Sequence, residues 1–409
     1  MWAVPGPASE HPSLQPRLVR SEGRMATAVL GGSNRILREA AGLPPLSGLV
    51  AAASPGCWKC PQGARRYLLT DNIVQLQAFQ QQKLATGYRI YGEKDTYFKT
   101  IEEKLAKNRL ILKDELKTLL HLCQTKDEVE LAKKAIYRYH AENKNTAFGE
   151  FKFGPVFIRL CYELDLEASA FELIKDQALR GFFSESTSFN ILMDMLFNKG
   201  QYERALEVLL EMKQQGIKFN RETYFLAFAI CYKLNSPESC KICTTLLEEA
   251  QLRGDQMPRK AYYFAVAFAL KQNDVVKARS YFSQIINTES RTCNNLNLLL
   301  QAESGDLDNL VQTLERAVDP SASDFVKKPE FCVEVLSTVR EKLEDNPTLC
   351  IWFEEIMAKL QASGQVTSLS LDDLLCQTPQ PRRRHTQLLR QKQVSQRTLK
   401  PLQSALLAE

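Results

Sequence analysis

The sequence predicts an all-α protein, an α-solenoid of stacked helical hairpins with disordered termini. The clearest hairpin pattern lies in residues 186–220, and weaker copies of its spacing recur along the chain. No segment shows the sustained alternation of apolar and polar residues that marks a half-buried strand. A single hairpin cannot bury its own apolar face, so the recurrence predicts a stack in which each copy covers its neighbours.

Residues 186–220 form one ungapped unit of 35 residues with two expected helices. The first helix is expected over 187–197 and ends at the Asn-Lys-Gly turn at 198–200. The second is expected over 202–215, and Gly216 follows it at the C′ position, where a left-handed residue commonly ends a helix. Each helix carries an apolar stripe at helical spacing, which predicts contact with helices on either side.

The other hairpins are predicted from a turn residue followed five positions later by a small residue, as in Gly200 and Ala205. A small side chain lets two antiparallel helices approach closely. The same spacing occurs at Asp127/Ala132, Asp165/Ala170, Asn235/Cys240, Asn273/Ala278 and, more loosely, Gly305/Leu310. The second members of the six pairs lie at intervals of 38, 35, 35, 38 and 32 residues. Units are therefore expected to start at Lys113, Phe151, Ser186, Arg221, Arg259 and Arg291.

Five short motifs in the clearest unit carry a resemblance to a known family. They are Ser-Phe-Asn at 188–190, Asn-Lys-Gly at 198–200, Glu-Arg-Ala-Leu-Glu at 203–207, Glu-Met-Lys at 211–213 and Gly-Ile-Lys at 216–218. This unit resembles a pentatricopeptide repeat over its full length. Residues 221–253 resemble one well, and the other units share only the spacing. The chain as a whole is similar to an animal mitochondrial member of the family, which implies a mitochondrial RNA-maturation factor.

The chain is expected to comprise five segments. In order, these are a transit peptide and disordered arm (1–66), an N-terminal helical cap (67–112), a solenoid of about six degenerate repeats (113–320), a C-terminal helical cap (321–376) and a basic tail (377–409). No run of eighteen apolar residues occurs, so no membrane span is expected. The oligomeric state cannot be read from these features.

The first 66 residues have the composition of a mitochondrial transit peptide, with eight Lys or Arg, three Glu and no Asp. Residues from Met25 onward can form a short basic amphipathic helix, and Met25 is a second candidate start. We therefore expect the protein in the mitochondrial matrix and residues 1–60 to be absent from its mature form. A basic arm without a targeting role is the alternative.

Charge is distributed unevenly along the chain. Residues 1–66 carry a net charge of +5 and residues 377–409 a net charge of +6, whereas the whole chain carries +5, so the body between them carries −6. An acidic body argues against capture of RNA over the whole surface, and any RNA-binding face must be local. The basic tail is expected either to bind phosphates or to remain solvated without a fixed partner.

No catalytic or metal-binding constellation is present, which predicts a protein that is not an enzyme and holds neither a metal nor a cofactor. The four histidines are His11, His121, His140 and His385. No HExxH, P-loop or nucleophile motif occurs. The pairs Cys57/Cys60 and Cys240/Cys243 are isolated CxxC spacings, and the eleven scattered cysteines suit packing in a reducing compartment.

The resemblance implies which residues contact RNA, because such repeats read one base per repeat with two or three side chains. The implied positions are the fifth and the last residue of a unit, with the second residue packing on the base. In residues 186–220 they are Asn190, Asn220 and Thr187. Asn offers both a donor and an acceptor to a base edge.

The next two units depart from this pattern. Phe225 and Tyr263 stand at their fifth positions, where an aromatic ring can stack on a base but cannot read it as an amide does. Position thirteen, which the resemblance places near the RNA backbone, is Lys233 in one unit and Lys271 in the next.

These observations predict a non-catalytic mitochondrial RNA-binding protein that acts in mRNA maturation and so supports the respiratory chain. Its expected partners are mitochondrial RNA and RNA-processing proteins. The alternative is a helical-repeat scaffold that binds proteins and reads no RNA. A helical structure whose concave face is acidic throughout would favour the scaffold.

The geometry of the array is expected to expose the base-reading amides. The first helices of the units should line the inner surface of a right-handed superhelix that contains no sheet. Asn190 and Asn220 should lie close together on that surface, exposed rather than buried. The reason is that Phe189, Leu192 and Leu196 must face the neighbouring helices, which turns Asn190 away from them.

Overall fold

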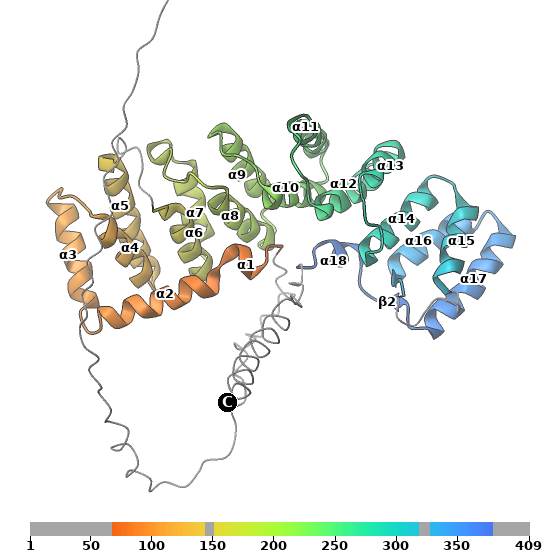
Figure 1. Cartoon of the computed structure of the whole chain (residues 1–409), viewed down its shortest axis with the longest axis horizontal. Helices are drawn as coiled ribbons and strands as arrows, with labels where there is room; N and C mark the ends of the chain where they lie inside the picture. Colours follow the sequence, from red (N-terminus) through yellow and green to blue (C-terminus); the bar gives the residue numbers. More distant parts are fainter. Residues whose placement is uncertain (1–67, 144–150, 319–327, 379–409) are drawn as a thin grey trace, which may run out of the picture. The chain divides into compact units, whose positions relative to one another are not determined.

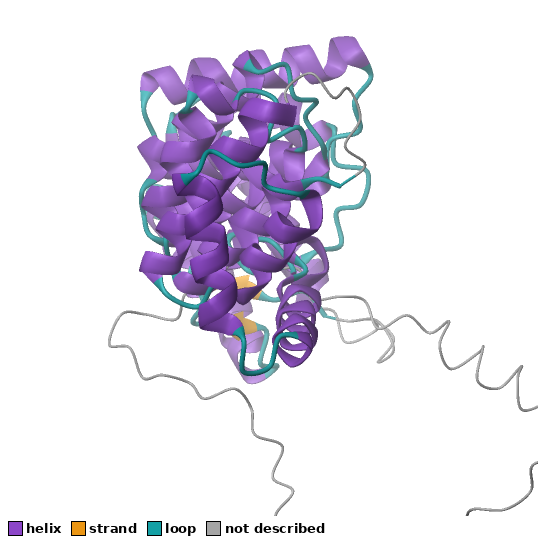
Figure 2. Ribbon diagram, turned by 90° about the vertical axis from the view of Figure 1, so that its left-hand side faces the viewer, coloured by secondary structure: helices purple, strands orange, loops and turns teal. Residues whose placement is uncertain are grey.

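The computed structural model describes residues 68–143, 151–318 and 328–378, and these residues are almost entirely helical (Figures 1 and 2). Most of their helices alternate between two layers. The A layer contains α4 (Lys113–Leu122), α6 (Phe153–Leu164), α8 (Ser186–Asn198), α10 (Arg221–Leu234), α12 (Arg259–Lys271), α14 (Arg291–Glu303) and α16 (Val333–Leu343). The B layer contains α5 (Lys126–Asn143), α7 (Glu167–Lys175), α9 (Tyr202–Gln214), α11 (Pro237–Arg253), α13 (Val275–Ser283), α15 (Leu307–Val318) and α17 (Pro347–Ala362).

The A layer is the continuous spine of the stack. Each A helix packs against the A helix before it and the one after it, from α4 to α16. Each also packs against the B helix that follows it in sequence, which makes seven hairpins in the described residues. The prediction of an all-α solenoid with at least five hairpins is confirmed. The handedness of the stack stays a prediction.

The predicted turn residues explain why the A helices end where they do. Five of the six adopt the left-handed conformation, with φ of 58° at Asp165, 72° at Gly200, 48° at Asn235, 57° at Asn273 and 74° at Gly305. Most side chains are strained there, whereas Gly, Asn and Asp tolerate it. The sixth, Asp127, lies instead in the first turn of α5. Local backbone chemistry therefore sets the hairpin boundaries.

Most of the predicted small residues lie in the interface between paired helices. Among the second members of the six predicted pairs, five are 0% exposed, namely Ala132, Ala170, Ala205, Ala278 and Leu310. Cys240 is only half-buried, so that position is less tightly enclosed. Five of the six predicted unit starts are the first residues of A helices, and α6 begins two residues after the expected Phe151.

The remaining helices precede, interrupt or follow the hairpins. They are α1 (Asp71–Val74), α2 (Leu76–Arg89), α3 (Lys94–Ala106), the 3-10 helix η1 (Gln177–Leu179) and α18 (Leu371–Leu375). Among the described residues, no helix is both long enough and apolar enough to cross a bilayer.

The expectation of no sheet is wrong in one small respect. Strands β1 (Phe331–Cys332) and β2 (Val366–Thr367) pair in parallel. The side chain of Asn295 on α14 holds β1, because its Nδ2 donates to the carbonyl oxygen of Glu330 at 3.0 Å and its Oδ1 accepts from the amide of Cys332 at 2.8 Å. Strands of two residues are too short to leave an alternating pattern in the sequence.

Candidate nucleic-acid interface

The A layer is covered by other parts of the chain at two places, along α4 to α8 and along α12 and α14 (Figure 1). We call residues 68–89 the N-terminal cover and residues 370–378 the C-terminal strap. In the cover, α1 packs on α8, and α2 packs on α4 and α6. In the strap, α18 packs on α12 and α14. The layer for which the sequence implies RNA contact is therefore partly occupied by the protein itself.

Asn190 and Asn220 lie side by side, as the sequence predicts, in a closed hydrogen-bond network. Asn190 Nδ2 donates to Asn220 Oδ1 at 3.0 Å. The same oxygen accepts from the amide of Thr223 at 2.8 Å, which makes Asn220 the N-cap of α10. Thr223 Oγ1 donates to Asn190 Oδ1 at 2.9 Å, and Asn220 Nδ2 donates to Ser186 Oγ at 3.1 Å. The two amides join α8 to the start of α10.

The expectation that both amides are exposed is wrong. Asn190 is 1% exposed, and Asn220 is half-buried. The reason is that α8 is enclosed on all sides by α1, α6, α7, α9 and α10, so a residue turned away from Phe189 still meets protein. Thr187, in the first turn of α8, is half-buried. Base contact by these three residues stays a prediction.

Asp194 in the middle of α8 is a buried acid that the sequence reading missed. One of its carboxylate oxygens accepts from the amides of Leu68 at 2.9 Å and Leu69 at 3.3 Å. Burial raises the pKa of Asp194 to about 7, and the two amides only partly oppose that rise. An acid within the otherwise apolar run from Ile191 to Phe197 was the available signal. Asp194 fastens the start of the N-terminal cover to the A layer.

Phe225 and Tyr263 are packed inside the protein, each 6% exposed. The Phe225 ring lies 5.7 Å from the ring of Phe264, measured between centroids. The Tyr263 hydroxyl is 2.8 Å from Ser290 Oγ. Neither ring presents a free face to a base in this structure, and their contact with RNA stays a prediction.

Three lysines of the A layer, which we call the lysine cluster, meet at the C-terminal strap. Lys233 Nζ lies 2.5 Å from Asp372 Oδ2. Lys260 Nζ donates to the carbonyl oxygen of Gln377 at 2.6 Å. Lys271, the third member, has its Nζ 3.8 Å from the ring centroid of Tyr232, next to Lys233, and lines the same cavity as Asp372. The structure thus brings the two predicted phosphate contacts together and adds Lys260, which the sequence reading missed.

The pKa values of the lysine cluster reflect its surroundings. Burial is the largest single influence on the pKa of Lys233 and lowers it, but the hydrogen bond and charge of Asp372, together with Cys376 and Tyr202, outweigh burial, and the net direction is upward. Burial lowers the pKa of Lys271 more than the charge of Asp372 raises it. Burial lowers the pKa of Lys260 to about 8, and within the described residues no carboxylate forms an ion pair with its ammonium group. Lys260 is therefore a partly desolvated cation with no carboxylate partner among the residues that the structure describes.

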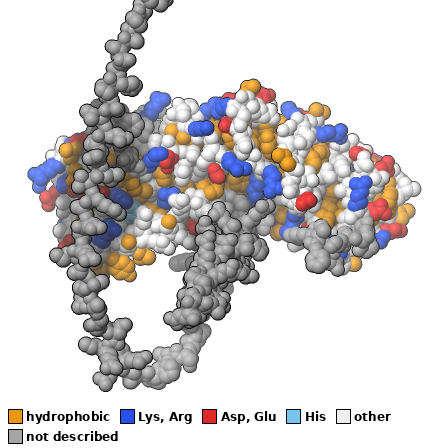
Figure 3. Space-filling view, in the orientation of Figure 1, with side chains coloured by type: hydrophobic (Ala, Val, Ile, Leu, Met, Phe, Trp, Pro, Cys, Tyr) orange, Lys and Arg blue, Asp and Glu red, His pale blue; other side chains and the backbone are white. Residues whose placement is uncertain are grey.

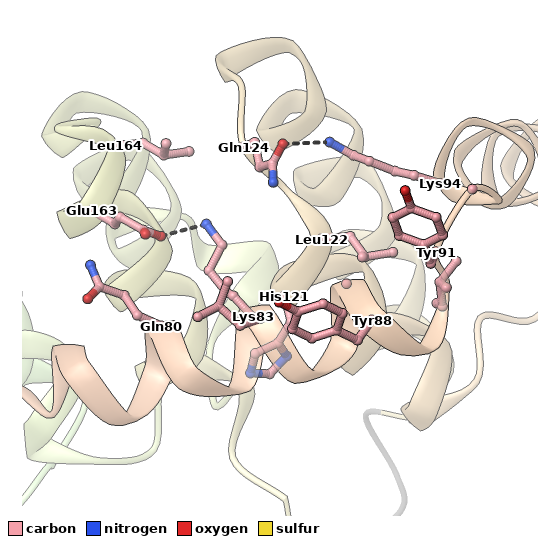
Figure 4. Close-up of a pocket in the computed structure, with 14 residues that line it drawn as sticks. Gln80, Lys83, Tyr88, Tyr91, Lys94, His121, Leu122, Gln124, Glu163 and Leu164 are labelled. Carbon is pink, nitrogen blue, oxygen red and sulfur yellow. Dashed lines mark hydrogen bonds and ion pairs between the residues drawn. The ribbon is translucent and has the colours of Figure 1, made fainter. Parts of the chain in front are cut away.

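A separate cavity of about 700 Å³ lies between α2, α4 and α6 (Figure 4). Its rim carries three exposed apolar side chains, with Leu84 64%, Tyr88 77% and Tyr91 87% exposed. Two lysines at its edge are paired, Lys83 with Glu163 and Lys94 with Glu128, each at 2.6 Å. The cavity is therefore a largely apolar surface without excess charge.

The two histidines in the described residues are packed, as a structural role requires. His121 Nδ1 lies 2.6 Å from the carbonyl oxygen of Lys117, and its Nε2 lies 3.1 Å from Gln82 Oε1. Burial lowers the pKa of His121. His140 packs edge-on against Phe182.

Charge and cysteine positions add no second site in the part of the chain that the structure describes. No group of three or more His, Cys, Asp or Glu residues there is arranged to hold a metal ion. On the face shown in Figure 3, basic and acidic side chains are interspersed rather than gathered into one basic field. The transit-peptide segment 1–66, His11, the Cys57/Cys60 pair, His385 and nearly all of the basic tail lie outside the described residues.

Comparison with known proteins agrees with this architecture. A family model described as the PPR repeat family matches residues 185–231. Proteins named "Pentatricopeptide repeat-containing protein 2, mitochondrial" match most of the chain. The Homo sapiens protein is 58% identical over 377 residues, which are 92% of this chain and 97% of that protein. The Mus musculus protein is 57% identical over 90% of this chain and 96% of its own, and the Danio rerio protein is 49% identical over 86% and 92%.

Proposed function

Because this chain belongs to the family of pentatricopeptide repeat proteins, we propose that it is a non-catalytic RNA-binding protein of the mitochondrial matrix. The observation that carries the proposal is the 58% identity to a relative whose name includes the word mitochondrial, over 97% of that relative. The family generally consists of non-catalytic helical proteins that bind RNA, and the matches indicate no enzyme family.

The lysine cluster supports the proposal from within the structure. Phosphate contacts provide most of the sequence-independent affinity of a protein for nucleic acid. Lys233 and Lys271 lie together on the A layer, as a backbone contact requires. Reading of bases by Asn190 and Asn220 is a second step in our proposal, because their mutual hydrogen bonds would first have to open.

We further propose that the bound RNA is a mitochondrial transcript and that the protein acts in mRNA maturation, exposing or protecting a processing site. RNA-processing proteins are then its partners, and respiratory-chain function depends on it. Depletion of the protein should cause unprocessed precursors of specific mitochondrial transcripts to accumulate before respiration falls. Normal transcript ends in depleted cells would contradict this role while leaving RNA binding intact.

Crosslinking in intact mitochondria followed by sequencing of the bound RNA tests the main proposal. We expect specific transcripts to be enriched, and the double variant Lys233→Gln/Lys271→Gln to recover less of them. Lys107→Gln/Lys213→Gln is the matched control, since it removes the same charge from ion pairs on α9 and after α3. Background recovery with the unaltered protein would contradict RNA binding.

The apolar cavity gives the alternative of a protein scaffold a specific basis. Leu84, Tyr88 and Tyr91 form the kind of exposed apolar patch that marks protein contacts. The scaffold predicts a complex that survives ribonuclease and is lost in Tyr88→Ser/Tyr91→Ser. A complex that ribonuclease dissolves would instead favour RNA as the link.

A further inference from the structure

We propose that the lysine cluster is a binding surface for the phosphodiester backbone of single-stranded RNA, and that the C-terminal strap occupies this surface until RNA displaces it. This inference rests on the proposed RNA binding and adds its location and its competitor. In this proposal, oxygen atoms of the strap occupy the positions that phosphate oxygens of the RNA would take. The argument depends on the position of the lysines, the chemistry of the strap's contacting atoms and the size of its helix.

The lysines are spaced along one surface rather than gathered at one point. Lys260 and Lys271 belong to α12 and are eleven residues apart, which is about 16 Å along a helix. Lys233, near the end of α10, pairs with Asp372, and Asp372 and Lys271 line the same cavity. An extended polyanion can therefore contact both ends of α12, whereas a single small anion cannot.

Aromatic rings border the lysines at both ends of this surface. Lys271 Nζ lies 3.8 Å from the ring centroid of Tyr232, and Lys260 Nζ lies 5.6 Å from that of Phe225. Both rings are buried, with Tyr232 2% and Phe225 6% exposed, so they offer no face to a base. They instead hold the two ammonium groups at this surface by cation–π contact.

Among the described residues, the strap's hydrogen bonds to the lysines are accepted by oxygen atoms. Asp372 supplies a carboxylate to Lys233, and Gln377 supplies a backbone carbonyl to Lys260. A phosphate oxygen can accept the same hydrogen bonds. At Lys260 it would do so better, because a charged acceptor makes a stronger bond than a neutral carbonyl and would compensate a cation that burial destabilises.

The strap is a short segment that packs on α12 and α14. Its helix, α18, has five residues, and a Ser370/Asp373 capping box starts it. Leu374 and Leu375 are buried beneath it, so displacement has a free-energy cost that weakens RNA binding without preventing it. Removing the strap's charge should therefore increase RNA affinity, which a merely structural ion pair would not do.

The test compares RNA affinity of the full-length chain with that of Asp372→Asn, using a fluorescent, unstructured single-stranded RNA of about twenty nucleotides. We expect affinity to rise about two- to fivefold, the range for a partly exposed ion pair. The logarithm of the affinity should also fall more steeply with the logarithm of salt concentration, by about 0.7, as for one more phosphate contact. Lys260→Gln should lower affinity.

Glu354→Gln is the matched control. It removes one negative charge from an exposed pair with Arg340 between α16 and α17. If it raises affinity as much as Asp372→Asn, the effect is one of net charge and the inference fails. Unchanged or reduced affinity of Asp372→Asn, at an unchanged melting temperature, also overturns it.

Hydrogen exchange on the unaltered protein gives a second readout that requires no variant. Addition of the RNA should accelerate exchange of the amides in residues 371–377. RNA that binds and leaves these amides equally protected overturns the inference but not the proposed function. RNA that binds neither the unaltered chain nor any variant overturns both.

Discussion

At the scale of single residues, Asn220 illustrates how a side chain suited to base recognition also suits a helix N-cap. A side-chain amide offers an acceptor oxygen and a donor NH2 group. Reading a base edge uses both groups, and so does the joining of two helices seen here. Here the acceptor caps α10 and the donor reaches Ser186 on α8. The amide is thus committed to joining two repeats, and its chemistry alone did not reveal that.

Replacing Asn220 with Ala should lower the free energy of unfolding by about 1 kcal/mol, the usual cost of losing an N-cap. Asn190→Ala should cost about 1–3 kcal/mol, because it leaves buried partners unsatisfied. Urea unfolding of the purified variants measures both. Thr187→Ala serves as the control, because Thr187 is the second residue of α8, the helix that contains Asn190. Its effect on the free energy of unfolding should stay within about 0.5 kcal/mol. If Asn220→Ala and Asn190→Ala lowered the free energy of unfolding no more than Thr187→Ala does, the hydrogen-bond network would add nothing to stability.

Asp194 makes stability depend on pH. Its pKa is raised to about 7 from an ordinary 3.8, because the charged form is buried. Between these values the folded chain holds a proton that the unfolded chain releases, so the contribution of Asp194 to stability falls as pH rises from about 4 to about 7 and is then constant. Asp194→Asn keeps the acceptor oxygen and removes this loss.

The stability of Asp194→Asn relative to the unaltered protein should therefore increase between pH 5 and pH 7, reaching a few kcal/mol at most. Denaturant unfolding at several pH values measures the difference. A difference that does not change with pH would show that the carboxyl group has the same proton affinity in the folded and unfolded chains.

At the scale of elements, hairpin boundaries are the most predictable part of this fold. The left-handed turn residues are Gly, Asn or Asp, which tolerate positive φ. Their positions could therefore be predicted from the sequence, from a turn residue followed five positions later by a small one. The contacts of Asp194 and Asp372 could not be found in this way. Their partners lie 126 and 139 residues away, and no local pattern connects them. The exposure of Asn190 was mispredicted for the same reason, because α1 and both neighbouring repeats enclose α8.

Asn273, between α12 and α13, tests the turn rule. It is exposed and has φ of 57°. Asn273→Ala should cost about 1 kcal/mol, because a Cβ without a compensating polar group is strained there. Asn273→Gly should cost nothing or stabilise slightly. The comparison is thermal melting of the two variants. Equal losses would mean that the side chain of Asn273, and not its backbone conformation, matters.

At the scale of the whole molecule, the proposed RNA-binding surface is a small part of an acidic body. The body between residues 66 and 377 carries a net charge of −6, whereas the lysine cluster lies along one part of the A layer beside the C-terminal strap. The family could be inferred from sequence because it rests on local motifs in residues 186–220. The contacts of the strap with Lys233 and Lys260 could not, because they join segments more than one hundred residues apart.

The mature protein should lack residues 1–60, in keeping with a transit peptide. Sequencing of the N-terminus of protein from purified mitochondria measures this. Protease treatment of mitoplasts should leave the protein intact if it resides in the matrix. An intact Met1 or Met25 in that preparation would contradict removal of the segment.

The two end segments differ from the repeats in how far along the chain their bonds reach. In the end segments, the hydrogen bond between Leu68 and Asp194 spans 126 residues and that between Lys260 and Gln377 spans 117. Between neighbouring repeats, the bonds from Lys175 to Glu207 and from Lys213 to Glu249 span only 32 and 36 residues. Opening a hairpin would therefore separate neighbours in sequence, whereas releasing an end segment would separate distant parts of the chain and leave every hairpin intact.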